Sequence, residues 1–109
     1  MKKQTEKELE KNIILNLKML GFYVYKTASS GSCYDYNLQF NEAGIADLIV
    51  IGGKNKVTFL EVKPPTKRNV KDGGLTGKQP DFKNLCKKHC INYAIVYSVK
   101  EALDAVRLD

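Results

Sequence analysis

Two short apolar runs, residues 48–51 and 57–60, are separated by a glycine-containing turn. Short apolar runs of this kind on either side of glycine predict two antiparallel strands joined as a hairpin. Asp47 stands directly before the first run, and Glu61 directly follows the second. The hairpin therefore brings both carboxylates to the same end of its strands, where a buried strand would continue with apolar residues.

Lys63 adds a cation to this end of the hairpin. Because strand side chains alternate between faces, Glu61 and Lys63 share one face while Leu60 and Val62 point to the other. Carboxylates that approach one another repel unless a cation separates them, and a hard divalent ion with oxygen ligands, such as Mg²⁺, is the usual solution. The alternative is a surface hairpin in which Glu61 and Lys63 are solvated cross-strand partners.

The length of 109 residues predicts one domain spanning residues 1–109. No apolar stretch approaches the roughly 20 residues that span a bilayer, and the N-terminus runs into charges rather than an apolar signal core. We therefore expect a cytoplasmic protein with no membrane partner. The three cysteines include no CxxC pair, so neither a disulfide framework nor a zinc ribbon is predicted.

Most of the positive charge lies in one segment. Residues 54–88 hold ten basic residues against three acids, in a chain whose net charge is +6. A basic field around a pair of acids predicts a polyanionic partner, and a phosphate backbone is the obvious candidate. The alternative is a solvated lysine-rich surface that binds nothing. The residues expected to contact nucleic acid are Lys26, Lys67, Arg68, Lys71 and Lys78.

Apolar periodicity and turn residues predict an α/β chain with the element order α-β-β-β-α-β-α. Its helices are expected over residues 5–20 and 76–88 and after Ser98, and its strands over 22–25, 48–51, 57–61 and 92–97. The first helix should bury Leu9, Ile13, Leu17 and Leu20, and the second Phe82, Leu85 and Cys86. Ser98 and Glu101 form a capping-box pattern at the start of the third.

Residues 27–44 form a long polar connection, and long connections in compact domains are usually functional or mobile. Apolar and polar residues alternate in its middle part. The apolar side chains there predict either an intramolecular flap or short strand, or a surface for dimer formation. These side chains are Tyr34, Tyr36, Leu38 and Phe40.

Three motifs together resemble the PD-(D/E)XK nuclease superfamily, and most closely its VRR-NUC domain. They are a G-x-x-D motif that ends at Asp47, the E-V-K triplet at residues 61–63, and an L-x-x-x-Q motif that ends at Gln79. The resemblance covers almost the whole chain and implies a restriction-endonuclease-like core with a mixed central sheet flanked by helices. One departure is Ala46, which stands where the family usually has proline and contributes no ligand.

The resemblance also implies roles for these residues. Asp47 and Glu61 would bind Mg²⁺ or Mn²⁺ together with the main-chain carbonyl of Val62. Lys63 would assist the attacking water or stabilise the transition state.

Family members also carry a glutamate on the first helix and a glutamine at the start of the helix after the lysine. These match Glu10, as a metal ligand and catalytic residue, and Gln79, as a catalytic residue. Glu6 and Glu8 compete with Glu10 for this assignment, and Glu10 could instead be a solvated helix residue.

The resemblance therefore predicts a metal-dependent endonuclease that hydrolyses DNA phosphodiester bonds in a bacterial or phage-infected cell. Stand-alone relatives imply a homodimer that acts on branched DNA such as the four-way (Holliday) junction. The alternatives are a flap or single-strand nuclease, and a non-catalytic nucleic-acid-binding module on the same fold.

Overall fold

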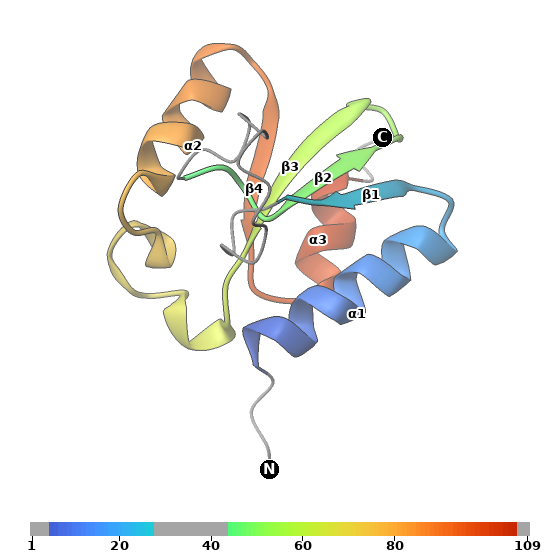
Figure 1. Ribbon diagram of the computed structural model, residues 1–109, viewed down its shortest axis with the longest axis horizontal. Helices are drawn as coiled ribbons and strands as arrows, with labels where there is room; N and C mark the ends of the chain where they lie inside the picture. The colour runs from blue at the N-terminus through green and yellow to red at the C-terminus, as the bar shows by residue number, and fades with distance from the viewer. Residues whose placement is uncertain (1–4, 28–43, 107–109) are drawn as a thin grey trace, which may run out of the picture.

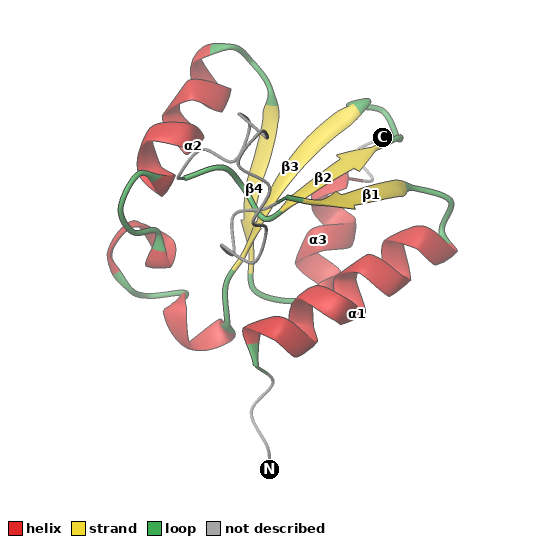
Figure 2. Cartoon of the chain, viewed as in Figure 1, coloured by secondary structure: helices red, strands yellow, loops and turns green. Residues whose placement is uncertain are grey.

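The computed structural model describes residues 5–27 and 44–106. These residues form helices and strands in the predicted order, so the α/β class is confirmed (Figure 1). The elements are α1 (Glu6–Met19), β1 (Tyr23–Lys26), β2 (Leu48–Ile51), β3 (Val57–Val62), α2 (Gln79–Lys88), β4 (Asn92–Val96) and α3 (Val99–Val106). Two short 3-10 helices, η2 (Pro65–Lys67) and η3 (Lys71–Gly74), lie in the connection between β3 and α2 (Figure 2).

The described strands form one mixed sheet in the order β1-β2-β3-β4. Strands β1, β2 and β3 pair antiparallel, and β3 pairs parallel with β4. The predicted hairpin is therefore formed by β2 and β3, with Leu48 opposite Leu60 and Ile51 opposite Val57. Strand β1 lies at one edge, and its outer side faces no other described strand.

The hydrophobic core lies between one face of the sheet and the helices α1 and α3 (Figure 1). Helix α1 contributes Leu9, Ile13 and Leu17, whose spacing of four residues places them on one stripe. The strands contribute alternate residues, which are Leu48, Val50, Leu60, Val62 and Val96. Because strand side chains alternate, Glu61 points to the opposite face of the sheet.

Helix α2 covers part of that opposite face. The Phe82 ring lies 5.1 Å from the Phe59 ring, edge-on, and 6.0 Å from the Tyr93 ring. These contacts cover β3 and β4. At the other end of the same face, Tyr23 and Tyr25 of β1 are exposed.

Two predicted core residues are exposed, and both predictions were wrong. Leu20 is exposed because α1 ends at Met19 and the chain turns into β1 through Gly21, which has φ +94°. Leu85 is 51% exposed although Phe82 and Cys86 on the same helix are partly or fully buried. Around the helix axis it lies on the side of Phe82 away from Cys86, so it falls at the margin of the buried stripe.

The second helix also starts later than predicted, at Gln79 rather than Thr76, because residues 76–78 form a turn. The apolar side chains expected to form a flap or dimer surface lie outside the described residues. They are Tyr34, Tyr36, Leu38 and Phe40. Within the described ranges, no helix has the length and apolar character needed to cross a bilayer.

Candidate active site

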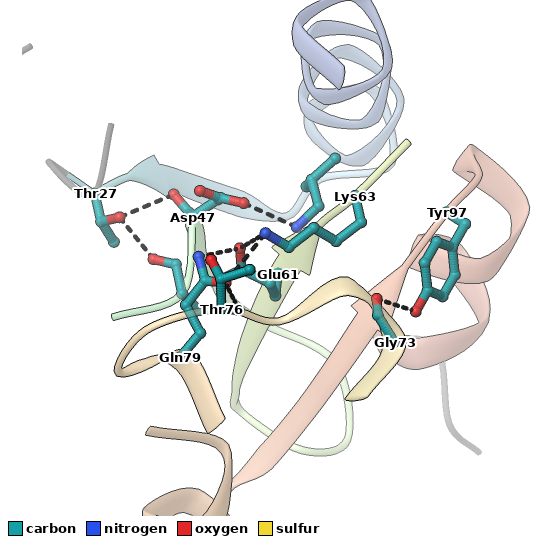
Figure 3. A network of polar contacts seen from close by, with 10 residues as sticks. Thr27, Asp47, Glu61, Lys63, Gly73, Thr76, Gln79 and Tyr97 are labelled. Carbon is teal, nitrogen blue, oxygen red and sulfur yellow. Dashed lines mark hydrogen bonds and ion pairs between the residues drawn. The ribbon is translucent and has the colours of Figure 1, made fainter. Parts of the chain in front are cut away.

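Asp47 stands directly before β2, and hydrogen bonds with two other segments fix its position. The Thr27 N–H donates a hydrogen bond of 2.9 Å to the Asp47 carbonyl oxygen, and the Thr27 hydroxyl donates to the carbonyl of Ala46 at 2.6 Å. On the other side, the Val62 N–H donates to Oδ2 of Asp47 at 2.9 Å. The carboxylate is therefore tied to the end of β3, directly beside the predicted ligand Glu61 (Figure 3).

A close approach of backbones explains the glycine that precedes Asp47. A Cβ atom on Gly44 would lie 2.5 Å from the carbonyl oxygen of Lys78, and Gly44 has φ +95°. Only glycine allows this contact without displacing one of the two segments. The segment that leads into Asp47 is thereby packed against the residue that precedes Gln79.

Glu61 is only 1% exposed, which is unusual for a glutamate. Burial raises the pKa of Glu61 to about 8, and the neighbouring Asp47 charge adds to this, whereas Lys63 opposes it. Its Oε1 atom has no hydrogen-bond donor among the described residues. Since two ionised carboxylates cannot donate to each other, Asp47 and Glu61 require either a shared proton or a cation.

Lys63 and Gln79 complete a polar network around Glu61 (Figure 3). Nζ of Lys63 lies 3.5 Å from Oε2 of Glu61 and donates a hydrogen bond of 3.1 Å to Oε1 of Gln79. Nε2 of Gln79 donates to Oε2 of Glu61 at 3.2 Å. The structure thus brings together four of the five predicted catalytic residues, Asp47, Glu61, Lys63 and Gln79.

Gln79 is oriented by the turn at the start of α2. The Thr76 N–H donates to the Gln79 side-chain oxygen at 2.9 Å, and the Gln79 N–H donates to the Thr76 carbonyl at 3.0 Å. With its oxygen occupied by Thr76 and Lys63, the amide presents its nitrogen to Glu61. The sequence showed no sign of this role for Thr76.

Glu10, the fifth predicted residue, is buried on α1 and pairs with Lys26, with 3.4 Å between Oε1 and Nζ. Burial raises the pKa of Glu10 and the Asp47 charge raises it further, while Lys26 lowers it. The Asp47 charge also raises the pKa of Glu6, after burial. Both acids therefore lie near the site, whereas Glu8 closes a capping box with Thr5.

Asp47 and Glu61 have the chemistry of divalent-cation ligands, although no cluster of three or more Asp, Glu, His or Cys side chains occurs among the described residues. Asp47 and Glu61 supply two carboxylates, and the main chain of Val62 lies against Asp47. The buried Oε1 atom of Glu61 has no donor within the described part of the chain, which a cation would compensate. Glu10 would join these ligands only by giving up its ion pair with Lys26.

The basic residues predicted to contact nucleic acid divide into two groups. Lys67, Lys71 and Lys78 are exposed along the connection between β3 and α2, which leads from Glu61 to Gln79. The other two are engaged by acids: Lys26 pairs with Glu10, and Arg68 pairs with Glu101.

Arg68 belongs to a contact between the β3–α2 connection and the end of β4. Its guanidinium lies over the Tyr97 ring, 4.7 Å from the centroid. The Tyr97 hydroxyl donates to the Gly73 carbonyl at 2.6 Å, and the Tyr97 N–H donates to Glu101 at 2.7 Å. The predicted capping box at α3 is therefore half formed, since Ser98 accepts from the Glu101 N–H but the Glu101 carboxylate binds Tyr97 and Arg68.

Comparisons of the chain with protein-family models, curated proteins and solved structures found no match.

Proposed function

We propose that this chain is a Mg²⁺- or Mn²⁺-dependent endonuclease that hydrolyses DNA phosphodiester bonds. The observation that carries the proposal is the pair formed by Asp47 and the almost fully buried Glu61, whose pKa is raised to about 8. A fold gains no stability from burying two carboxylates against each other. Such a pair is expected where a cation has to be bound. We also propose that the chain is a PD-(D/E)XK nuclease of the VRR-NUC type and that its fold has a restriction-endonuclease-like core.

In this proposal, Asp47, Glu61 and the carbonyl of Val62 hold the cation, with Glu10 as a further candidate ligand. When bound, the ion supplies Lewis-acid polarisation of the scissile phosphate and lowers the pKa of a water molecule. The other residues of the site position these ligands. Thr27 and Val62 hold Asp47 in place, and Gln79 holds Oε2 of Glu61, which leaves Oε1 without a donor among the described residues.

Lys63 stabilises the negative charge that develops on the phosphate oxygens. Its ammonium group lies next to Glu61 and Gln79 and is mostly buried, so water screens it little. The exposed lysines Lys67, Lys71 and Lys78 contribute attraction for the phosphate backbone that is independent of base sequence. Binding and chemistry are therefore assigned to different lysines.

Activity on branched DNA by a homodimer is the finer part of the proposal. A four-way junction presents two symmetric strands, and a C₂ dimer is the simplest assembly that offers two identical sites to them. Sedimentation velocity at micromolar concentration tests this part. A 12.3 kDa monomer without preference for junctions would be compatible with a nuclease but would contradict the junction resolvase.

The experiment that tests the function is a cleavage panel. Labelled linear duplex, single-stranded, flap and four-way junction DNA are incubated with the wild-type chain in Mg²⁺, Mn²⁺ or EDTA. Cleavage is expected in both metals and absent in EDTA. Asp47→Asn and Glu61→Gln should lower the rate by at least about three orders of magnitude, because each removes one charge of the cation site.

Asp81→Asn is the matched control, because Asp81 is an exposed acid in the first turn of α2. It should cleave like the wild type. Full activity of Asp47→Asn or Glu61→Gln would contradict the proposal. DNA binding by the wild type without cleavage in any metal would identify a non-catalytic binding module instead.

A further inference from the structure

A groove follows the boundary between α1 and the outer edge of β1, which faces no other described strand, and two hollows mark it. One, of about 480 Å³, is lined by Lys18, Gly21 and the chain from Phe22 to Tyr25. The other, of about 280 Å³, lies towards the start of α1 and the end of β1. Its lining consists of Lys7, Glu10, Lys11, Ile14, Leu15 and Lys26. Because β1 runs back along α1 after the turn at Gly21, the two hollows follow one another along the same pair of elements.

The groove is strongly basic. Lys7, Lys11 and Lys18 are exposed residues of α1, spaced by four and seven positions, so they form one stripe along roughly 16 Å of helix. Lys26 adds a fourth cation from β1, and Glu10 is the one acid among the described residues that line the two hollows. This balance fits a polyanion. The lysines of α1 stand outside the basic segment noted in the sequence, so charge counting along the chain missed them.

Two aromatic side chains accompany the lysines. Tyr23 is 67% exposed and Tyr25 is 55% exposed, and both point to the face of the sheet away from α1, so they flank the edge of β1 on the side opposite the lysines. Large aromatic side chains left exposed beside a basic groove provide flat surfaces on which unpaired bases stack. Duplex bases are already stacked on one another and cannot use such surfaces.

The groove leads to the candidate active site. Lys26, at its end, pairs with Glu10 at 3.4 Å. The next residue, Thr27, donates hydrogen bonds to the main chain of Ala46 and Asp47. A strand that follows β1 from Tyr23 to Lys26 therefore arrives at the carboxylate pair without crossing another element of residues 5–27 and 44–106.

We propose that the α1–β1 groove binds one unpaired strand of nucleic acid and guides it to the site at Asp47 and Glu61. The phosphates contact Lys7, Lys11, Lys18 and Lys26, and bases stack on Tyr23 and Tyr25. The inference rests on the proposed nuclease function for the direction of the strand, and it specifies a substrate with a single-stranded portion, such as a flap, in place of a fully paired four-way junction. Flaps and single strands should therefore bind better than uninterrupted duplex.

The lysines are tested by fluorescence anisotropy with a labelled oligo(dT) of 20 nucleotides in EDTA, across a series of salt concentrations. Lys7→Ala/Lys11→Ala is compared with Lys83→Ala/Lys87→Ala, since both pairs are exposed lysines four residues apart on a helix. The first pair of substitutions should reduce the slope of log K against log salt by about 1.4, which corresponds to the loss of two phosphate contacts to a single strand. The second pair should leave the slope unchanged. Equal slopes for the two variants would overturn the inference in favour of diffuse attraction.

The tyrosines are tested with the same oligonucleotide. Tyr23→Ala and Tyr25→Ala should each weaken binding by roughly 5- to 150-fold, the range for loss of one stacked base, while the phenylalanine variants should bind like the wild type. Binding of duplex DNA should change little. Unchanged single-strand affinity in both alanine variants would contradict the inference.

Sedimentation velocity identifies the other possible occupant, a second copy of the chain paired along β1. If Tyr23→Ala dissociates a dimer while each protomer binds oligo(dT) as before, the groove is an interface and the inference is wrong. Because binding is measured without metal, the result is separate from the proposed catalysis. If the chain cleaves DNA but binds oligo(dT) independently of α1, only this inference is wrong. If it binds oligo(dT) through α1 but does not cleave DNA, only the proposed activity is wrong.

Discussion

Gln79 donates a hydrogen bond from Nε2 to Oε2 of Glu61 across 3.2 Å, and this bond joins the start of α2 to the end of β3. The same amide accepts from Lys63 at 3.1 Å, and the Lys63 ammonium also pairs directly with Oε2 of Glu61 at 3.5 Å. Glu61 thus has one oxygen held by a neutral donor and a nearby ammonium, and one oxygen left for a cation.

Replacing Gln79 by leucine should lower the cleavage rate by roughly 10- to 100-fold. The estimate corresponds to the loss of one hydrogen bond to a charged group, worth about 1.5–3 kcal/mol. Leucine fills similar space but leaves Glu61 without its neutral donor. Single-turnover cleavage in Mg²⁺ measures the effect, and Asn84→Ala, at an exposed position of the same helix, is the control. Cleavage by Gln79→Leu at the wild-type rate would make Gln79 a structural residue.

The stability of the metal-free protein should fall as pH rises. Because the pKa of Glu61 is about 8 in the folded protein and near 4.5 in the unfolded chain, the folded state holds a proton that the unfolded state has lost between these values. The free energy of unfolding therefore decreases by up to about 1.4 kcal/mol per pH unit across this window and is level above pH 8.

Glu61→Gln isolates this effect, because glutamine cannot ionise and every other group is shared with the wild type. Urea unfolding in EDTA at pH 5 and pH 7.5 should show the variant gaining about 3 kcal/mol relative to the wild type at the higher pH. A difference between the two proteins that does not change with pH would show that Glu61 titrates normally.

Two substitutions of Asp47 should separate its structural role from its catalytic one. Asp47→Asn keeps a side-chain oxygen for the Val62 N–H and removes the repulsion with Glu61, so the metal-free protein should be as stable as the wild type or more stable. Asp47→Ala leaves the Val62 N–H without an acceptor and should cost about 1–3 kcal/mol. Both should lose cleavage. Urea unfolding in EDTA distinguishes them, and an asparagine variant less stable than the alanine variant would contradict this account.

Much of this site could be predicted from the sequence because its geometry is local. The pairing of β2 with β3 follows from two apolar runs and a short turn, and the alternation of strand side chains then fixes the side on which Glu61 lies. Gln79 was predicted from the resemblance alone. Its orientation by Thr76 depends on a turn, and because of this turn α2 starts three residues later than predicted.

Contacts between distant segments could not be predicted. Arg68 counted as one more cation of a basic segment, but its partner Glu101 lies 33 residues later and meets it only in the folded chain. In the same way, Lys7, Lys11 and Lys18 are separated in sequence from Lys26 and share a groove with it only because β1 returns along α1. Net charge along a sequence does not reveal such surfaces.

The contact between Tyr97 and Gly73 should support the site from a distance. Tyr97→Phe removes the hydroxyl that donates to the Gly73 carbonyl and should cost about 1 kcal/mol of stability. Since Gly73 lies shortly before the turn that orients Gln79, kcat should fall by several-fold while DNA affinity stays the same. Lys71→Ala provides the opposite pattern, with weaker binding in salt titrations and unchanged kcat. Weaker DNA binding by Tyr97→Phe would assign Tyr97 to the DNA surface instead.

Isothermal titration calorimetry of the metal-free chain with Mn²⁺ at pH 7 tests most directly whether Asp47 and Glu61 hold a divalent cation. We expect one ion per chain, with release of a proton because Glu61 has a pKa of about 8. Asp47→Asn and Glu61→Gln should each weaken the affinity by about two orders of magnitude, while Asp81→Asn binds like the wild type. Equal Mn²⁺ affinity in all four proteins, or no binding by the wild type at millimolar Mn²⁺, would contradict the account.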